Sequence, residues 1–175
     1  MDLRALVREI PDFPRPGILF RDITPLLLDP DGLDAAVAGL AAAVAEGGDG
    51  VVDFVVAAEA RGFILGAALA RELHAGFVPA RKPGKLPADT VTAEYALEYG
   101  LDALEVHADA LADGARVLVH DDLLATGGTA GALCELVSSL GGNVVGCSFL
   151  IELVALGGRA RLAPHPVSSL IRFEE

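Results

Sequence analysis

The sequence is poor in several residue types, and each shortage narrows what the protein can be. Its 175 residues include no tryptophan, one methionine, two cysteines, and 13 basic residues against 25 acidic ones. Cys134 and Cys147 lie in apolar segments, so we expect reduced core residues and neither a disulfide nor a metal pair. A net charge of -12 without a basic stripe argues against a free-standing nucleic-acid binder. An anionic small molecule is still compatible, because a few local cations can outweigh the global charge within one cleft.

A long apolar run is also missing. The longest, residues 35–45, is rich in alanine and well short of the ~18 residues that cross a bilayer. The amino-terminal stretch MDLRALVREIPDF carries charges throughout, unlike a secretory signal. The histidines are scattered without metal-ligand spacing, at His74, His107, His120 and His165. We therefore predict a cytoplasmic protein of one domain that has no membrane partner.

Five short segments are β-branched or aromatic and bounded by turn residues, which predicts buried strands. They are residues 51–57, 76–80, 115–121, 143–153 and 168–173. Helical patterns lie between them, at residues 34–46, 62–74 and 129–140. This alternation predicts an α/β fold with a parallel sheet covered by helices on both faces. Ligands of such sheets bind beyond the carboxyl ends of the strands, here at the loops after Ala57, Ala80 and Val119.

Two regions fall outside this alternation. Residues 10–33 hold four prolines before Asp29 and are not expected to form a regular core element. Residues 81–106 begin as a basic loop rich in proline and glycine and continue with the alternation of an exposed β-arm. Long loops in compact domains tend to be functional, so we interpret the first region as a small lid and the second as a mobile flap. In the alternative interpretation, both are surface connections.

The stretch VLVHDDLLATGGTAGAL, residues 117–133, joins a predicted strand to a predicted helix through small residues. Backbone N–H groups at the start of a helix suit a phosphate, and glycine lets the backbone approach it closely. Thr126 and Thr129 add hydroxyl donors. The glycine spacing matches neither a dinucleotide-binding fold nor a P-loop. The stretch therefore predicts a phosphate cradle of another kind.

Asp121 and Asp122 precede this cradle. Two carboxylates beside a phosphate would repel it unless they hold neutral donors or a cation, and ribose hydroxyls and Mg²⁺ are such partners. A phosphate next to a vicinal diol is a ribose 5-phosphate. In the alternative interpretation, Asp121 is a helix or turn cap and Asp122 is its solvated neighbour.

Five stretches together resemble the type I phosphoribosyltransferases, and within them the adenine phosphoribosyltransferases. They are IPDFPRPGILFRDITPLL, EARGFILGAALA, RKPGKLP, LEYGLDALEVH and DDLLATGGTAGALCEL, in the family's order. The resemblance implies one domain over residues 1–175 with a central, mainly parallel five-stranded sheet. Residues 1–33 would form a hood that binds the base, and residues 34–175 the core with a flexible flap at about 81–106. A homodimer, in which a neighbouring subunit contributes to the site, is also implied.

The resemblance assigns a role to each motif residue. For the 5-phosphate it implies Ala125, Thr126, Gly127, Gly128 and Thr129, and for the ribose hydroxyls Asp121 and Asp122. For pyrophosphate it implies Glu59, Ala60, Arg61, Arg81, Lys82 and Lys85. Leu19, Phe20 and Arg21 would bind adenine, with the Phe20 ring stacked on the base and the other two acting mainly through their backbone. Glu98 would be the catalytic carboxyl that relays the purine proton, with Arg61 as the cation at the reacting end.

The implied reaction converts adenine and phosphoribosyl pyrophosphate into AMP and pyrophosphate, in purine salvage. Mg²⁺ would be held mainly through the substrate, with Asp121 and Asp122 as candidate ligands. Three alternatives stay open from the sequence: another purine base (hypoxanthine, guanine or xanthine), a non-catalytic module that senses phosphoribosyl pyrophosphate, and Glu94 in place of Glu98. The chain departs from the family at Ala57, where glycine is usual, and a left-handed backbone there would cost on the order of 1 kcal/mol.

Overall fold

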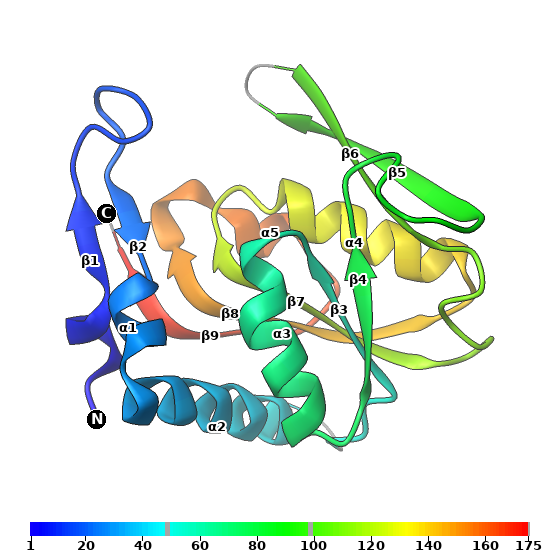
Figure 1. Ribbon diagram of the computed structural model, residues 1–175, viewed down its shortest axis with the longest axis horizontal. Helices are drawn as coiled ribbons and strands as arrows, with labels where there is room; N and C mark the ends of the chain where they lie inside the picture. The colour runs from blue at the N-terminus through cyan, green and yellow to red at the C-terminus, as the bar shows by residue number, and fades with distance from the viewer. Residues whose placement is uncertain (48–49, 98–99, 175) are drawn as a thin grey trace.

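The computed structural model describes residues 1–47, 50–97 and 100–174 (Figure 1). Its strands and helices, in chain order, are β1 (Arg8–Ile10), β2 (Phe20–Asp22), α1 (Thr24–Leu28), α2 (Pro30–Gly47), β3 (Phe54–Ala58), α3 (Arg61–Glu72), β4 (Gly76–Ala80), β5 (Thr90–Leu97), β6 (Gly100–His107), β7 (Arg116–Leu124), α4 (Gly128–Ser139), β8 (Asn143–Leu153), α5 (Gly158–Arg161) and β9 (Val167–Phe173). None of the helices in the described ranges combines the length and the hydropathy that a membrane crossing requires.

Five of the strands form one parallel sheet in the order β4-β3-β7-β8-β9. Helices α2 and α3 cover one face and α4 covers the other (Figure 1). Leu65 of α3 and Leu150 of β8 belong to the core on the first face, and Leu133 of α4 lies with Phe149 in the core of the second. The predicted α/β fold is confirmed. Because these strands are buried on both faces, their apolar runs are nearly continuous and the sequence marks them clearly.

Strand β7 continues past its predicted end at residue 121. Its pairing with β8 extends to Leu124, which lies opposite Glu152. Asp121 and Asp122 therefore belong to the last part of the strand and do not follow it. The reason is tertiary: β8 has 11 residues and supplies partners for β7 beyond the point where the local apolar pattern stops.

Residues 10–33 contribute to the core, contrary to the sequence-based expectation. Strands β1 and β2 form a small antiparallel pair, and α1 follows β2 directly. Ile23 and Leu26 are buried against α2 and the sheet. Helix α2 starts at Pro30, because Asp29 accepts a hydrogen bond from the Gly32 N–H at 2.9 Å as an N-cap and proline suits the first helical position. The prolines thus mark helix starts as well as turns.

The region 81–106 contains β-structure, as its alternating pattern predicts, and its two strands β5 and β6 pair as an antiparallel hairpin. One face of this hairpin is buried rather than exposed. Ala93, Tyr95, Leu104 and Val106 join the core on the α4 side of the sheet, and Figure 1 shows the hairpin crossing above α4. The alternating pattern predicts that the arm has two different faces, but it does not predict that one of them packs into the core on the α4 side of the sheet.

Candidate active site

Two adjoining clefts, of about 260 and 230 Å³, open at the carboxyl ends of β3 and β7. They share Arg61, Asp121, Asp122 and Thr129. The first is lined in addition by Ala58, Glu59, Ala60, Lys82, Tyr95, Asp102 and Leu104, and the second by residues 123–128 and Ala130. Sequence motifs from three separate loops thus meet at the edge of the sheet where ligands of parallel sheets bind.

The phosphate cradle is a tight turn between β7 and α4. Gly127 has a φ of +80° and immediately precedes the helix, and its carbonyl accepts the Gly131 N–H at 2.9 Å. Helix α4 then runs for 12 residues, so its first N–H groups and its positive end face the second cleft. Only glycine fits easily at position 127, because a Cβ there would also lie 2.8 Å from the carbonyl oxygen of Gly158.

Helix α5 forms the outer wall of this cradle. A Cβ on Gly158 would lie 3.0 Å from the Gly127 nitrogen and 2.8 Å from Leu124 Cδ1, and closer still to the carbonyl oxygen of Ala125. The backbone of α5 therefore touches the cradle backbone directly. The sequence analysis missed this wall, although the Gly157–Gly158 pair ahead of Arg159 is a signal for close backbone approach.

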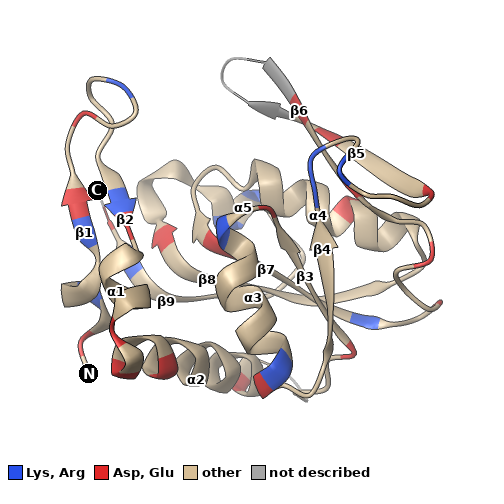
Figure 2. Ribbon diagram, viewed as in Figure 1, with Lys and Arg blue, Asp and Glu red and all other residues tan. Residues whose placement is uncertain are grey.

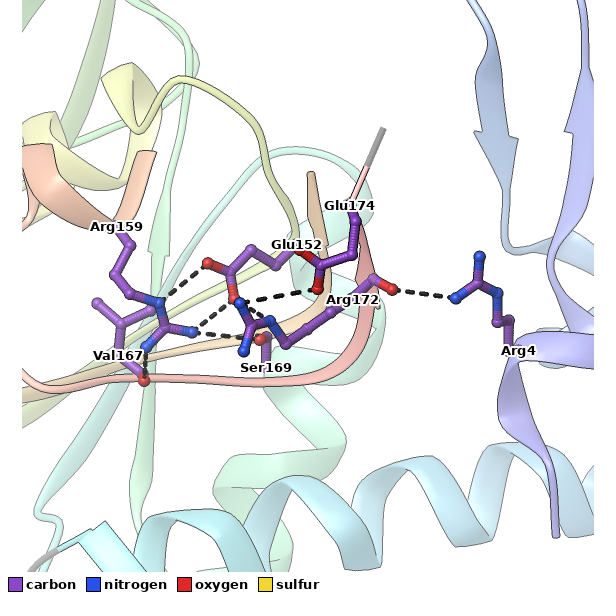
Figure 3. A network of polar contacts seen from close by, with 7 residues as sticks. All are labelled: Arg4, Glu152, Arg159, Val167, Ser169, Arg172 and Glu174. Carbon is purple, nitrogen blue, oxygen red and sulfur yellow. Dashed lines mark hydrogen bonds and ion pairs between the residues drawn. The ribbon is translucent and has the colours of Figure 1, made fainter. Parts of the chain in front are cut away.

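A buried carboxylate fixes α5 in place (Figure 3). Glu152, 3% exposed at the end of β8, accepts two hydrogen bonds from Arg159, at 2.9 Å to Nε and 2.5 Å to Nη2. The hydroxyl of Ser169 donates to the same carboxylate at 2.5 Å, and Arg172 lies 3.8 Å away. The bond from Arg159, set against the opposing effect of burial, keeps the pKa of Glu152 below its ordinary value. This network joins the cradle wall to two strands of the sheet.

Asp121 and Asp122 face the region between the two clefts. The Asp122 side chain is 4% exposed, and its Oδ2 lies 3.2 Å from Arg61 Nε. Burial, and next the charge of Asp122, raise the pKa of Asp121 well above its ordinary value. Burial also raises the pKa of Asp122, and Arg61 offsets part of that effect. Two full negative charges are therefore costly here, and donors from a diol or a cation would stabilise them.

The predicted pyrophosphate loop lies against these aspartates. Gly62 lets α3 approach closely, because a Cβ there would lie 2.8 Å from Asp121 Oδ1. The guanidinium of Arg61 is half exposed and reaches over the Phe20 ring, 5.2 Å from its centroid. The carboxylate of Glu59 accepts a hydrogen bond from Arg81 Nε at 2.9 Å, so it holds a cation of the flap. Arg61 is the side chain of this loop that is placed to meet an anion.

The flap cations are not all in the cleft. Figure 2 shows basic residues in the loop that joins β4 to β5. Lys82 lines the first cleft, whereas Lys85 is exposed and Arg81 is bound to Glu59. Lys82 contacts two residues that the sequence analysis missed, Tyr95 and Asp102. Tyr95 and Asp102 lie on the hairpin β5–β6. The alternation of apolar residues that predicts these strands does not indicate that the two polar side chains contact each other.

The hood brings Phe20 to the cleft edge. Its ring makes an edge-on contact with Phe13, with the centroids 5.1 Å apart. Leu19 is exposed, and the Arg21 side chain is buried against Phe173 and bonded to Glu9. Any contact of Arg21 with a base would therefore use its backbone.

Two further sequence-based points have different outcomes. Glu98 lies outside the described residues, so its predicted role stays a prediction. Ala57 lies inside β3, paired with Pro79 on one side and His120 on the other, and does not have a left-handed backbone. Alanine in place of the usual glycine therefore brings no left-handed backbone strain at this position.

Comparison with known proteins agrees with this geometry. The family model described as a phosphoribosyl transferase domain matches residues 27–165. An adenine phosphoribosyltransferase of Prochlorococcus marinus is 58% identical over 174 residues, covering 99% of each chain. The crystal structure of the adenine phosphoribosyltransferase from Thermoanaerobacter pseudethanolicus matches with a TM-score of 0.94 at 52% identity, over 98% of each chain. The crystal structure of the adenine phosphoribosyltransferase from Saccharomyces cerevisiae, in complex with adenine and an imino-altritol bisphosphate, matches with a TM-score of 0.92 at 38% identity, over 96% of each chain. The chain belongs to the phosphoribosyltransferase family, and within it to the adenine phosphoribosyltransferases.

Proposed function

We propose that the paired clefts are the active site in which the chain transfers the 5-phosphoribosyl group of phosphoribosyl pyrophosphate to adenine, giving AMP and pyrophosphate. One observation carries the assignment: two adjacent aspartates, of which Asp122 is buried, lie between a helix-start cradle and an exposed arginine. A ribose 5-phosphate with a leaving group at its other end needs these three features in this order.

The cradle and the aspartates would bind the sugar phosphate. N–H groups at the start of α4 and the hydroxyls of Thr126 and Thr129 donate to the 5-phosphate. Asp121 and Asp122 would accept hydrogen bonds from the ribose hydroxyls, which would offset part of the repulsion between the two carboxylates.

Magnesium fits this site only together with the substrate. The described ranges contain no group of three or more His, Cys, Asp and Glu side chains that could hold a metal ion. Asp121 and Asp122 offer hard oxygen ligands, and the remaining ligands would come from the ribose and the pyrophosphate. Mg²⁺ would supply charge neutralisation of the leaving pyrophosphate.

The leaving group and the base would lie on the other side of the aspartates. Arg61 and Lys82 would bind pyrophosphate, and closure of the flap would exclude water, which suppresses hydrolysis. Phe20 would stack on adenine, and backbone groups of the hood would read its edge, so that hypoxanthine or guanine would leave buried groups unpaired. Glu98 would relay the purine proton. Purine salvage as the role, a homodimer as the assembly and the cytoplasm as the location are further parts of this proposal.

Turnover with adenine, hypoxanthine and guanine, measured side by side with phosphoribosyl pyrophosphate and Mg²⁺, tests the proposal. We expect AMP from adenine and at least about 100-fold lower kcat/KM with the other bases, because each mismatch leaves a buried donor or acceptor unpaired. Preferred use of hypoxanthine or guanine would overturn the base assignment. No nucleotide from any base would favour the sensing module instead. Asp122→Asn should weaken phosphoribosyl pyrophosphate binding, while Asp89→Asn on the exposed loop serves as the matched control.

A further inference from the structure

Two polar side chains, Lys82 and Tyr95, converge on one carboxylate oxygen of Asp102 at the cleft wall formed by the flap. Tyr95 on β5 and Asp102 on β6 lie directly opposite each other in the hairpin register. The Tyr95 hydroxyl donates to Asp102 Oδ2 at 2.9 Å, and the Lys82 ammonium donates to the same oxygen. Lys82 Nζ also lies 3.4 Å from the Tyr95 hydroxyl oxygen. All three line the first cleft together with Thr129.

This cluster connects the hairpin to the phosphate cradle. Tyr95 is 7% exposed and its ring is part of the core that α4 shares with the hairpin. Burial and the bond to Asp102 raise the pKa of Tyr95, and Thr129, which lines the same cleft, has the opposite effect. Thr129 lies in the first turn of α4, where the cradle is formed. The position of Lys82 is thus tied to the element that would bind the 5-phosphate.

The position of the Asp102 carboxylate, in the wall of the first cleft, calls for a physical explanation. A carboxylate in a cleft that binds a highly anionic substrate is unfavourable unless it does something else there. Its polar partners from other residues' side chains are Lys82 and Tyr95. An ammonium group has three donors, and Asp102 and Tyr95 occupy two of them, so one is left for a ligand in the cleft. Holding a long, flexible side chain in advance removes the ordering cost that binding would otherwise meet.

We propose that Asp102 and Tyr95 are positioning residues, which hold the Lys82 ammonium toward the pyrophosphate of the substrate. The inference deepens the proposed function and rests on it. Partial burial lowers the pKa of Lys82, but its bonds to Asp102 and Tyr95 raise it by more, so the lysine stays charged near neutral pH. The cluster therefore holds the Lys82 side chain in one position, and the ammonium group keeps its positive charge.

Two roles of Asp102 toward Lys82 can be told apart, because they predict opposite changes in the affinity for phosphoribosyl pyrophosphate when Asp102 is removed. If Asp102 merely neutralised Lys82, its removal would free the cation and tighten binding of phosphoribosyl pyrophosphate. If Asp102 positions Lys82, its removal weakens that binding. The sign of the change therefore separates the two roles.

A double-mutant cycle with Asp102→Ala and Lys82→Met tests the proposal in the full chain. Each single variant should raise the KM for phosphoribosyl pyrophosphate and the inhibition constant of pyrophosphate about tenfold, as expected for one charge-assisted hydrogen bond. The double variant should match Lys82→Met alone, because Asp102 acts only through the lysine. The KM for adenine should stay within about twofold.

Controls keep the test decisive. Thr92→Val removes a similar cross-strand contact, the 3.3 Å bond from Thr92 Oγ1 to Glu105, on the exposed face of the hairpin, and should leave both constants unchanged. If Asp102→Ala fails to fold, Tyr95→Phe combined with Lys82→Met gives the same cycle with the ring preserved. Tighter binding in the Asp102 variant, or additive effects in the double variant, would overturn the proposal. Absence of AMP from the unmodified protein would instead refute the proposed function itself.

Discussion

Replacing Gly158 with alanine should weaken phosphate binding although no residue of the cradle itself is substituted. The new Cβ would lie 2.8 Å from Leu124 Cδ1 and 3.0 Å from the Gly127 nitrogen, about 1 Å inside normal contact distance. The nearest atom is the backbone oxygen of Ala125, so no flexible side chain can simply move aside. Either α5 or the cradle must shift, and Glu152 holds α5 through Arg159. We therefore expect the cradle to move.

The size of the effect follows from that displacement. Overpacking of this kind lowers the free energy of unfolding by about 1–3 kcal/mol. A displacement of about 1 Å at a reacting or binding group can lower the rate about 100-fold. We expect kcat/KM for phosphoribosyl pyrophosphate to fall by about 10- to 100-fold and the affinity for AMP to fall with it, while the fold is retained.

The neighbouring glycine supplies the matched control. Gly157 has a φ of +68°, and a Cβ there would meet nothing within 4 Å. Gly157→Ala should therefore lower the free energy of unfolding by about 1–2 kcal/mol through backbone strain alone, with binding unchanged. Urea unfolding measures stability in both variants, and steady-state kinetics with AMP titration measures the site. Wild-type affinity in Gly158→Ala, or equal loss of affinity in Gly157→Ala, would refute the argument from contact with the cradle.

Three other changes test separate parts of the site. Arg61→Lys should raise the inhibition constant of pyrophosphate about tenfold, measured by product inhibition, because lysine lacks the paired donors of the guanidinium. Glu152→Gln should lower the melting temperature at neutral pH, since glutamine loses the ion pair with Arg159. The folded state lowers the pKa of Glu152, so the stability that its charge contributes is fully present above the ordinary value of 4.5 and is lost as the pH falls through the folded-state pKa. In thermal melts, the difference between the two proteins should therefore shrink as the pH falls below 4.5. Glu98→Gln should lower turnover strongly and leave phosphoribosyl pyrophosphate binding within a few-fold, and unchanged turnover would move the proton relay to another group such as Glu94.

The sequence alone determined the fold class and the loops that line the candidate site. Strands at residues 76–80 and 143–153 were placed to the residue, since a strand buried on both faces is an uninterrupted apolar run that local pattern reveals. The start of the helix at the cradle was placed within one residue, because the Gly127–Gly128 pair and the apolar spacing after it are local signals. The family resemblance then implied roles for the motif residues, and these roles stay predictions.

Tertiary structure decided which polar side chains support those motifs. Glu152 and Arg159 brace the cradle, and Tyr95 and Asp102 hold Lys82, yet none of these residues stands in a pattern that predicts its partner. Periodicity tells which face of a strand a residue occupies, but the partner on that face comes from another segment brought there by a crossover or a hairpin. A contact of this kind depends on register and packing across the whole sheet, and only the folded chain fixes both.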